Sequence, residues 1–202
     1  MNPSNGAKSE TLRGSRMRFV EAFLREPLSV GSCWPSSSGL CHAVVDPCEF
    51  REGDTVVELG PGTGAFTERL LERMRGRGRL LAMEISETNI AELRRRLPHC
   101  QTIHDSAEHL PQYLGTRRAA CIISGLAWGN MSAATQDRLL AAIQQSLAPG
   151  GHFVAFAYAH VAWFPTARRF RRRLLEEFAR VEKTPIIWRN LPPAHVYHCW
   201  QS

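Results

Sequence analysis

The chain has 202 residues, of which 44% are hydrophobic and 22% are charged, which is typical of one folded domain and excludes a disordered chain. No apolar run reaches the 18 residues that a membrane-spanning helix needs. The formal net charge is +6 and all but two of the 25 basic residues are arginine. This composition indicates either a GC-rich genome or an anionic partner: a lipid surface, a nucleic acid or a phosphorylated substrate.

The first 48 residues predict a helical arm. Over residues 10–26 the apolar side chains cluster on one helical face and arginines surround it, which predicts a basic amphipathic helix that ends before Pro27. A loop rich in Pro, Gly and Ser follows, and then a short helix over residues 36–45. We therefore divide the chain into an arm, residues 1–48, and a domain, residues 49–202.

Strands and helices alternate through the rest of the chain. This order predicts an α/β domain with a mainly parallel sheet. The predicted strands are residues 55–59, 79–85, 100–104, 119–124, 152–158, 181–189 and 195–200, and the predicted helices are residues 65–75, 86–97, 133–147 and 166–178.

The most informative segment is Glu58-Leu59-Gly60-Pro61-Gly62-Thr63-Gly64, between the first strand and the first helix of the domain. Its glycines let the backbone turn tightly and approach a ligand, and the helix start presents unpaired N–H groups. Glu84 ends the second strand, where a carboxylate can accept hydrogen bonds from both hydroxyls of a ribose. The unit therefore predicts an adenosine-containing ligand.

This segment resembles motif I of the class I S-adenosylmethionine-dependent methyltransferases, over residues 52–202. The resemblance implies a Rossmann-like, seven-stranded, mostly parallel sheet with helices on both faces and an antiparallel last strand pair. It also implies S-adenosylmethionine as the cofactor. The residues in the family's cofactor positions are Gly60, Gly62 and Gly64 for the methionine part, Glu84 for the ribose, Glu58 below the turn, Ile85 against the adenine, and Asp105, Ser106 and Ala107 near the adenine amine.

The segment after the fourth predicted strand corresponds to the family's fourth motif, beside the transferred methyl group and the cofactor. Ser124 and Ala127 replace the Asn/Asp and Pro of the amine methyltransferases, which argues against amide-type recognition of a nucleobase. Trp128 is a candidate to offer its π face to a cationic product, and the alternative is that it packs in the core at the strand end. Tyr158 and His160, at the end of the fifth strand, are candidates for an amine or phosphate contact and for a base.

The stretch from residue 19 to residue 130 resembles the small bacterial phospholipid N-methyltransferases, which methylate phosphatidylethanolamine. The residues that carry this resemblance are Phe23-Leu24, Pro27-Leu28, Val30-Gly31, Pro35-Ser36-Ser37 and Ser124-Gly125-Leu126. The resemblance implies an amino-lipid substrate and contact of residues 10–26 with an anionic membrane. The five arginines within Arg168–Arg173 could bind lipid phosphates or form a solvated helix face.

Three other functions remain open: an rRNA adenine N-methyltransferase, a methyltransferase acting on a small-molecule amine of secondary metabolism, and a cofactor-binding module without catalysis. No secretory signal is recognisable, so we expect a cytoplasmic protein that can lie peripherally on the inner face of the cell membrane. No two cysteines have metal-motif spacing, and His195 and His198 would face opposite sides of a strand, so no metal site is predicted. The sequence leaves the oligomeric state open.

Overall fold

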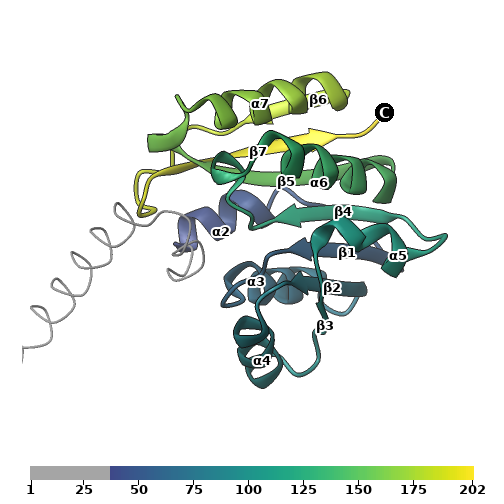
Figure 1. The fold of residues 1–202 in the computed structure, drawn as a ribbon. Coiled ribbons are helices and arrows are strands. Elements are labelled where there is room, and N and C mark those ends of the chain that lie inside the picture. The colour runs from purple at the N-terminus through teal and green to yellow at the C-terminus, as the bar shows by residue number, and fades with distance from the viewer. Residues whose placement is uncertain (1–36) are drawn as a thin grey trace, which may run out of the picture. The chain divides into compact units, whose positions relative to one another are not determined.

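The computed structural model describes residues 37–202, which form a seven-stranded sheet between two layers of helices (Figure 1). The strand order is β3-β2-β1-β4-β5-β7-β6. Strands β1 to β5 are parallel, whereas β7 is antiparallel to both β5 and β6, which confirms the predicted architecture. The strands are β1 Asp54–Leu59, β2 Gly78–Glu84, β3 Gln101–His104, β4 Ala119–Ser124, β5 Leu147–Tyr158, β6 Arg180–Lys183 and β7 Ala194–Trp200.

Helices cover both faces of the sheet because alternate strand residues point to opposite sides. On one face α2, α3 and α4 pack on a core that includes Val56, Ile123 and Val154. On the other face α5, α6 and α7 pack on a core that includes Val57 and Phe153. The helices are α2 Ser38–Val45, α3 Ala65–Met74, α4 Glu87–Arg96, α5 Leu110–Leu114, α6 Ala133–Ser146 and α7 Pro165–Glu177, and the 3₁₀ turns are η1 Ala107–His109, η2 Trp128–Asn130 and η3 Ala159–Val161.

Most predicted elements agree with the structure to within two residues, and larger differences occur in three places. Strand β6 ends at Lys183, where the prediction continued to residue 189, because Pro185 has no N–H group to donate to a strand ladder. Strand β5 begins at Leu147, where the prediction began at residue 152, since Leu147 already pairs with Ala119 of β4. Helix α5 was not predicted at all, because its five residues are too few to show a helical period.

The N-terminal part of the described chain packs into the domain. Ser37 caps α2 through its hydroxyl, which accepts a hydrogen bond from Leu40 N at 3.2 Å, and Leu40 and Val44 are buried in the core beside α3. The helix predicted over residues 10–26 lies outside the described residues. The division into residues 1–48 and 49–202 stays a prediction.

The chain segments after β1 and β4 approach each other more closely than side chains at Gly60 and Gly125 would permit. Gly125 N donates a hydrogen bond to Leu59 O at 2.8 Å. A Cβ atom on Gly125 would lie 2.4 Å from Gly60 O, and one on Gly60 would lie 2.6 Å from a methyl carbon of Leu126. The glycine-rich turn and the loop after β4 therefore form one closely packed unit.

We expect Gly125→Ala to lower the free energy of unfolding by roughly 1–3 kcal/mol, because the added methyl group overlaps the Gly60 carbonyl oxygen. The matched control is Gly39→Ala in α2, where the new Cβ has an ordinary 3.5 Å contact and the helix gains about 0.5–1 kcal/mol. Urea unfolding of both variants measures the difference. Equal effects of the two substitutions would contradict the close approach.

Candidate functional site

Four neighbouring strands bring the predicted site residues to one edge of the sheet. Leu59, the last residue of β1, pairs with Met83 of β2 on one side and with Ser124 of β4 on the other. Ser124 in turn pairs with Ala155 of β5, three residues before Tyr158. The residues after these strands therefore line a common rim, which is where open parallel sheets bind ligands.

The glycine-rich turn forms the centre of this rim. Gly60, Gly62 and Gly64 have φ angles of 71°, 55° and 88°, a region that other residues rarely adopt. Gly64 occupies the N-cap of α3, and no side chain caps the N–H groups of this helix start. A Cβ on Gly64 would lie 2.7 Å from a methyl carbon of Leu93. The N–H groups of the three glycines donate to Met83 O, Glu84 and Pro61 O, so the backbone donors left for a polar ligand are those of the uncapped first turn of α3.

The carboxylate of Glu84 is held against this turn. It accepts hydrogen bonds from Gly62 N at 3.1 Å, from Ser86 N at 2.9 Å and from the Asn89 amide at 3.3 Å, and it is only 7% exposed. A carboxylate accepts about four hydrogen bonds, so Glu84 keeps acceptor capacity for a ligand hydroxyl. The structure places Glu84 where the sequence predicted it, while its role as a ribose ligand stays a prediction.

Glu58 lies below the turn and is completely buried. One carboxyl oxygen accepts a hydrogen bond from the Thr67 hydroxyl at 2.7 Å, and the other, Oε1, has no partner. Burial raises the pKa of Glu58 to about 7, further helped by the charge of Glu84 and opposed by the hydrogen bond from Thr67. An unpartnered carboxyl oxygen at this depth costs stability and favours a polar or cationic ligand group beside it.

The residues predicted to surround an adenine lie after β2 and β3. Ile85 is 73% exposed, as an apolar contact for a ring requires. The carboxylate of Asp105 already accepts three hydrogen bonds, from His109, from the Tyr113 hydroxyl and from Ser106 N, and these lower its pKa to about 2. Ser106 caps the short turn that begins at Ala107. An adenine amine would therefore compete for one remaining acceptor position on Asp105.

The prediction that Trp128 offers a π face to substrate is wrong. Its indole ring is 1% exposed and stacks on Phe170 of α7, with ring centroids 4.3 Å apart. The indole N–H donates to the Ser124 hydroxyl at 2.9 Å, so both side chains lie inside the core behind the rim. The sequence left core packing open as the alternative and could not decide for it, because the stacking partner is 42 residues further along the chain. The predicted cofactor contact of Ser124 stays a prediction.

Tyr158 and His160 lie side by side at the end of β5. Their ring centroids are 5.7 Å apart, with Tyr158 half-buried and His160 exposed. Burial raises the pKa of Tyr158 and lowers the pKa of His160. At neutral pH the pair therefore offers a protonated phenol and a neutral imidazole, which are a hydrogen-bond donor and a proton acceptor.

Several residues that build the site were not predicted. Gly125 permits the contact between the two rim loops, Thr67 binds Glu58, Asn89 binds Glu84, and Tyr113 binds Asp105. Thr67 and Asn89 each lie one helical turn inside the helix that follows a predicted acid. That spacing was a usable signal, whereas the role of Gly125 depends on two strands that are far apart in sequence.

Comparison with known proteins agrees with this geometry. A family model described as a methyltransferase domain matches residues 56–151. The ornithine lipid N-methyltransferase of Singulisphaera acidiphila is 29% identical over 187 residues, covering 90% of this chain and 93% of that protein. The ribosomal RNA small subunit methyltransferase A of Thiobacillus denitrificans is 47% identical over 83 residues, covering 41% of this chain and 27% of that protein. A solved SAM-dependent O-methyltransferase from Thermotoga maritima shares the fold, with a TM-score of 0.62 at 13% identity, covering 87% of this chain and 69% of that one.

We expect Glu58→Gln to stabilise the ligand-free protein above pH 7 by roughly 3 kcal/mol, the free energy that corresponds to a pKa shift of about two and a half units. The pKa of this carboxyl group is about 7 in the folded chain and near 4.5 when exposed, so the wild type loses stability as pH rises between these values. The neutral amide keeps the Thr67 hydrogen bond and avoids the buried charge.

Urea unfolding from pH 4.5 to pH 8 tests this prediction. The difference between Glu58→Gln and wild type should be absent at the low end and reach its full value above pH 7. The exposed Glu52→Gln should follow the wild type throughout. A difference that does not change with pH would contradict the assignment.

Proposed function

Because this chain is a class I S-adenosylmethionine-dependent methyltransferase, we propose that it methylates the amine of an amino lipid at a membrane surface. The observation that carries the proposal is the similarity to an ornithine lipid N-methyltransferase along 90% of the chain. The rRNA relative is similar over a shorter segment, which covers about a quarter of its own length. Similarity over that segment supports the use of S-adenosylmethionine as the cofactor and does not identify the methyl acceptor.

The residues at the rim fit S-adenosylmethionine. The uncapped first turn of α3 presents N–H groups after the glycine turn, Glu84 has acceptor capacity for a ribose hydroxyl, and Glu58 has an unpartnered oxygen beneath. The rim therefore combines backbone N–H donors with carboxylate acceptors, which suits a zwitterionic amino acid moiety joined to a ribose. When bound, the cofactor supplies an electrophilic methyl group.

An acceptor amine must lose its proton before it can attack a methyl group, and an alkylammonium group has a pKa of about 10. We assign proton acceptance to the imidazole of His160, which its lowered pKa keeps neutral at neutral pH. The phenol of Tyr158, 5.7 Å away between ring centroids, stays protonated and can donate a hydrogen bond to a lipid head group. Both roles are proposals from position and charge state.

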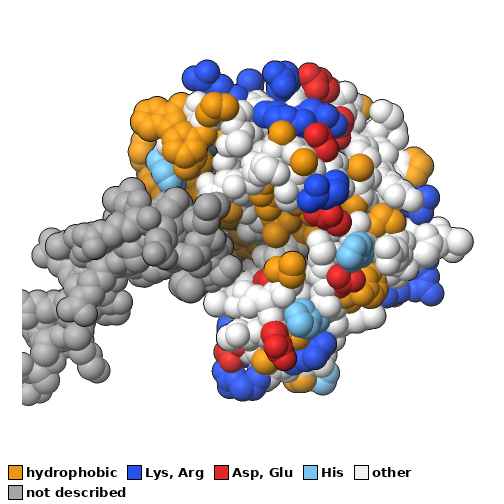
Figure 2. Space-filling model, viewed as in Figure 1, with side chains coloured by type: hydrophobic (Ala, Val, Ile, Leu, Met, Phe, Trp, Pro, Cys, Tyr) orange, Lys and Arg blue, Asp and Glu red, His pale blue; other side chains and the backbone are white. Residues whose placement is uncertain are grey.

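Exposed aromatic side chains beside this rim support a membrane-facing surface. Trp163 follows β5 and is 70% exposed, and Trp188 precedes β7 and is 74% exposed. Figure 2 shows hydrophobic side chains gathered at the upper left of the coloured part of the molecule, near where Figure 1 places the carboxyl end of β5 and the start of β7. Tryptophan prefers the interface between lipid and water. No helix within residues 37–202 is long and apolar enough to cross a bilayer.

The arginines of α7 contribute less to an anionic contact than their number suggests. Arg169 and Arg173 bind Asp137 of α6, and Arg172 pairs with Glu176 on its own helix. Among the described residues, only Arg168 and Arg171 of this run have no ion-pair partner. These two exposed guanidinium groups are the ones we assign to lipid phosphates or to anionic head groups.

We expect Glu84→Ala to weaken S-adenosylmethionine binding by about 1–3 kcal/mol, because charge-assisted hydrogen bonds to the ribose are lost. Glu87→Ala is the matched control, since Glu87 is an exposed acid three residues further along the chain. Isothermal titration calorimetry on the full chain measures both. Equal affinities of the two variants would remove Glu84 from the cofactor site.

The acceptor is tested in cells that express the wild type or Glu84→Ala. Mass spectrometry of total lipids should find mono-, di- or trimethylated amine head groups in the wild type and none in the variant. The same cells supply rRNA and small metabolites for analysis. Methylated adenine or a methylated metabolite, with an unchanged lipid extract, would overturn the lipid proposal and favour one of the alternatives.

We expect the double variant Trp163→Ser/Trp188→Ser to bind lipid vesicles about tenfold more weakly, or about 1.4 kcal/mol, because two aromatic side chains no longer enter the interface. Sedimentation with vesicles of anionic and neutral lipids measures the binding. The control Leu175→Ser removes an exposed apolar side chain of α7. Loss of the same size in the control would contradict a specific membrane face.

A further inference from the structure

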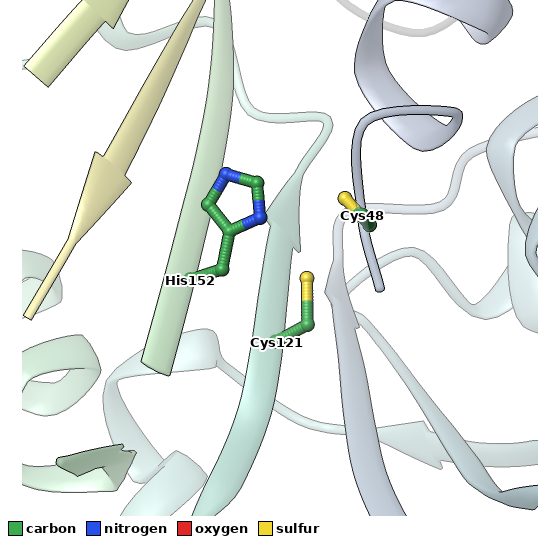
Figure 3. A group of neighbouring side chains, drawn as sticks. All are labelled: Cys48, Cys121 and His152. Atoms are coloured by element: carbon green, nitrogen blue, oxygen red, sulfur yellow. The ribbon is translucent and has the colours of Figure 1, made fainter. Parts of the chain in front are cut away.

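A second group of reactive side chains lies away from the rim, in the amino-terminal half of the central strands. Cys48 precedes β1, Cys121 lies on β4, and His152 lies on β5 directly opposite Cys121. All three side chains are buried, and one ligand atom from each lies within 4.8 Å of the others. Figure 3 shows the two sulfur atoms and one ring nitrogen of His152 facing a common point.

A chain of hydrogen bonds determines which His152 nitrogen carries a proton. His198 Nε2 lies 3.0 Å from Ala43 O, and a carbonyl oxygen only accepts, so this nitrogen is the protonated one. His198 Nδ1 is then an acceptor, and His152 Nε2, 3.1 Å away, must donate to it. The other nitrogen of His152, Nδ1, is then unprotonated and keeps its lone pair, and it is the nitrogen that faces the two cysteines in Figure 3.

The remaining contacts hold the ligand atoms in place. The His152 ring stacks on Trp200, with centroids 4.6 Å apart and an angle of 7° between the planes. Cys48 Sγ lies 3.4 Å from Val44 O, to which its thiol donates. An oriented imidazole whose second nitrogen is hydrogen-bonded to a neighbouring group is the usual arrangement around a bound metal ion.

We propose that Cys48, Cys121 and His152 bind one thiophilic metal ion, Zn²⁺, through two sulfur atoms and His152 Nδ1. Two thiolates and one imidazole form a ligand set that zinc prefers over magnesium or calcium. Binding releases the two thiol protons, and two thiolates balance the charge of one Zn²⁺, so the buried site carries no net charge.

A route for the ion and for a fourth ligand lies beside the site. A cavity of about 480 Å³ is lined by His152 itself and by Pro47 and Ala120, the residues that precede the two cysteines. Water from this cavity can complete a tetrahedral shell. The bound ion would join the segment after α2 to β4 and β5, and would therefore stabilise the attachment of α2 to the sheet.

The test uses the full-length reduced chain after removal of metals with a chelator. Titration with Co²⁺ should produce a thiolate-to-metal charge-transfer band that saturates at one ion per chain, and Zn²⁺ should abolish it. Cys48→Ser and Cys121→Ser should each bind Zn²⁺ at least about 100-fold more weakly. Cys100→Ser, which removes a buried thiol outside the group, should bind like the wild type.

A second variant tests the orientation of the imidazole. His198→Phe keeps both thiols and His152 but removes the acceptor of the His152 N–H group, so Zn²⁺ affinity should fall by roughly 10–100-fold. Zn²⁺ should also raise the melting temperature of the wild type and of Cys100→Ser, but not that of Cys48→Ser.

Two results would overturn the proposal. One is that the reduced wild type shows no cobalt–thiolate band. A Cys48–Cys121 disulfide found by mass spectrometry in the protein as isolated, together with no band after reduction, counts as the same result. The other is a band of equal strength in the wild type and in Cys48→Ser. Neither result depends on methyl transfer, so failure here leaves the proposed function untouched.

Discussion

The site depends on the contact between the backbone after β1 and the backbone after β4. Gly125 donates from its N–H group to Leu59 O, and neither Gly60 nor Gly125 has room for a methyl group. Because both loops end parallel strands at the same edge, this contact sets the shape of the rim to which Glu84 and Tyr158 are attached. The positive φ angles of the turn then bring the uncapped first turn of α3 to the end of the strands, where its N–H groups can bind a ligand.

The two acids around that turn, Glu84 and Glu58, differ in how the protein supports their carboxylates. Glu84 accepts hydrogen bonds from the N–H groups of Gly62 and Ser86 and retains acceptor capacity for a ligand. These hydrogen bonds stabilise its negative charge before a ligand binds. Glu58 is buried with one oxygen unpartnered, which raises its pKa and costs the ligand-free protein stability. Proteins commonly accept such a cost at binding sites, because a preorganised polar group need not be reoriented when the ligand arrives.

Histidines and cysteines lie close together in the amino-terminal half of the central strands. Two hydrogen bonds, from His152 to His198 and from His198 to Ala43 O, join β5, β7 and α2, three elements that only the folded chain brings together. The stacked ring of Trp200 fixes His152, and a thiol from the segment after α2 lies next to it. The same sheet therefore holds a carboxylate-lined rim at one edge and a soft-ligand group nearer the other.

Local sequence determined the strand–turn–helix unit, the acid at the end of β2 and the alternation that predicted a parallel sheet, because glycine conformation and hydrophobic period act over a few neighbouring residues. Tertiary structure decided the rest. The position of Trp128 after β4 predicted a site residue. Its ring instead stacks on Phe170 in the core, because α7 packs against the segment that carries it. Cys48, Cys121 and His152 show no motif spacing, because their proximity arises from strand order and register, which are set by pairings between distant segments.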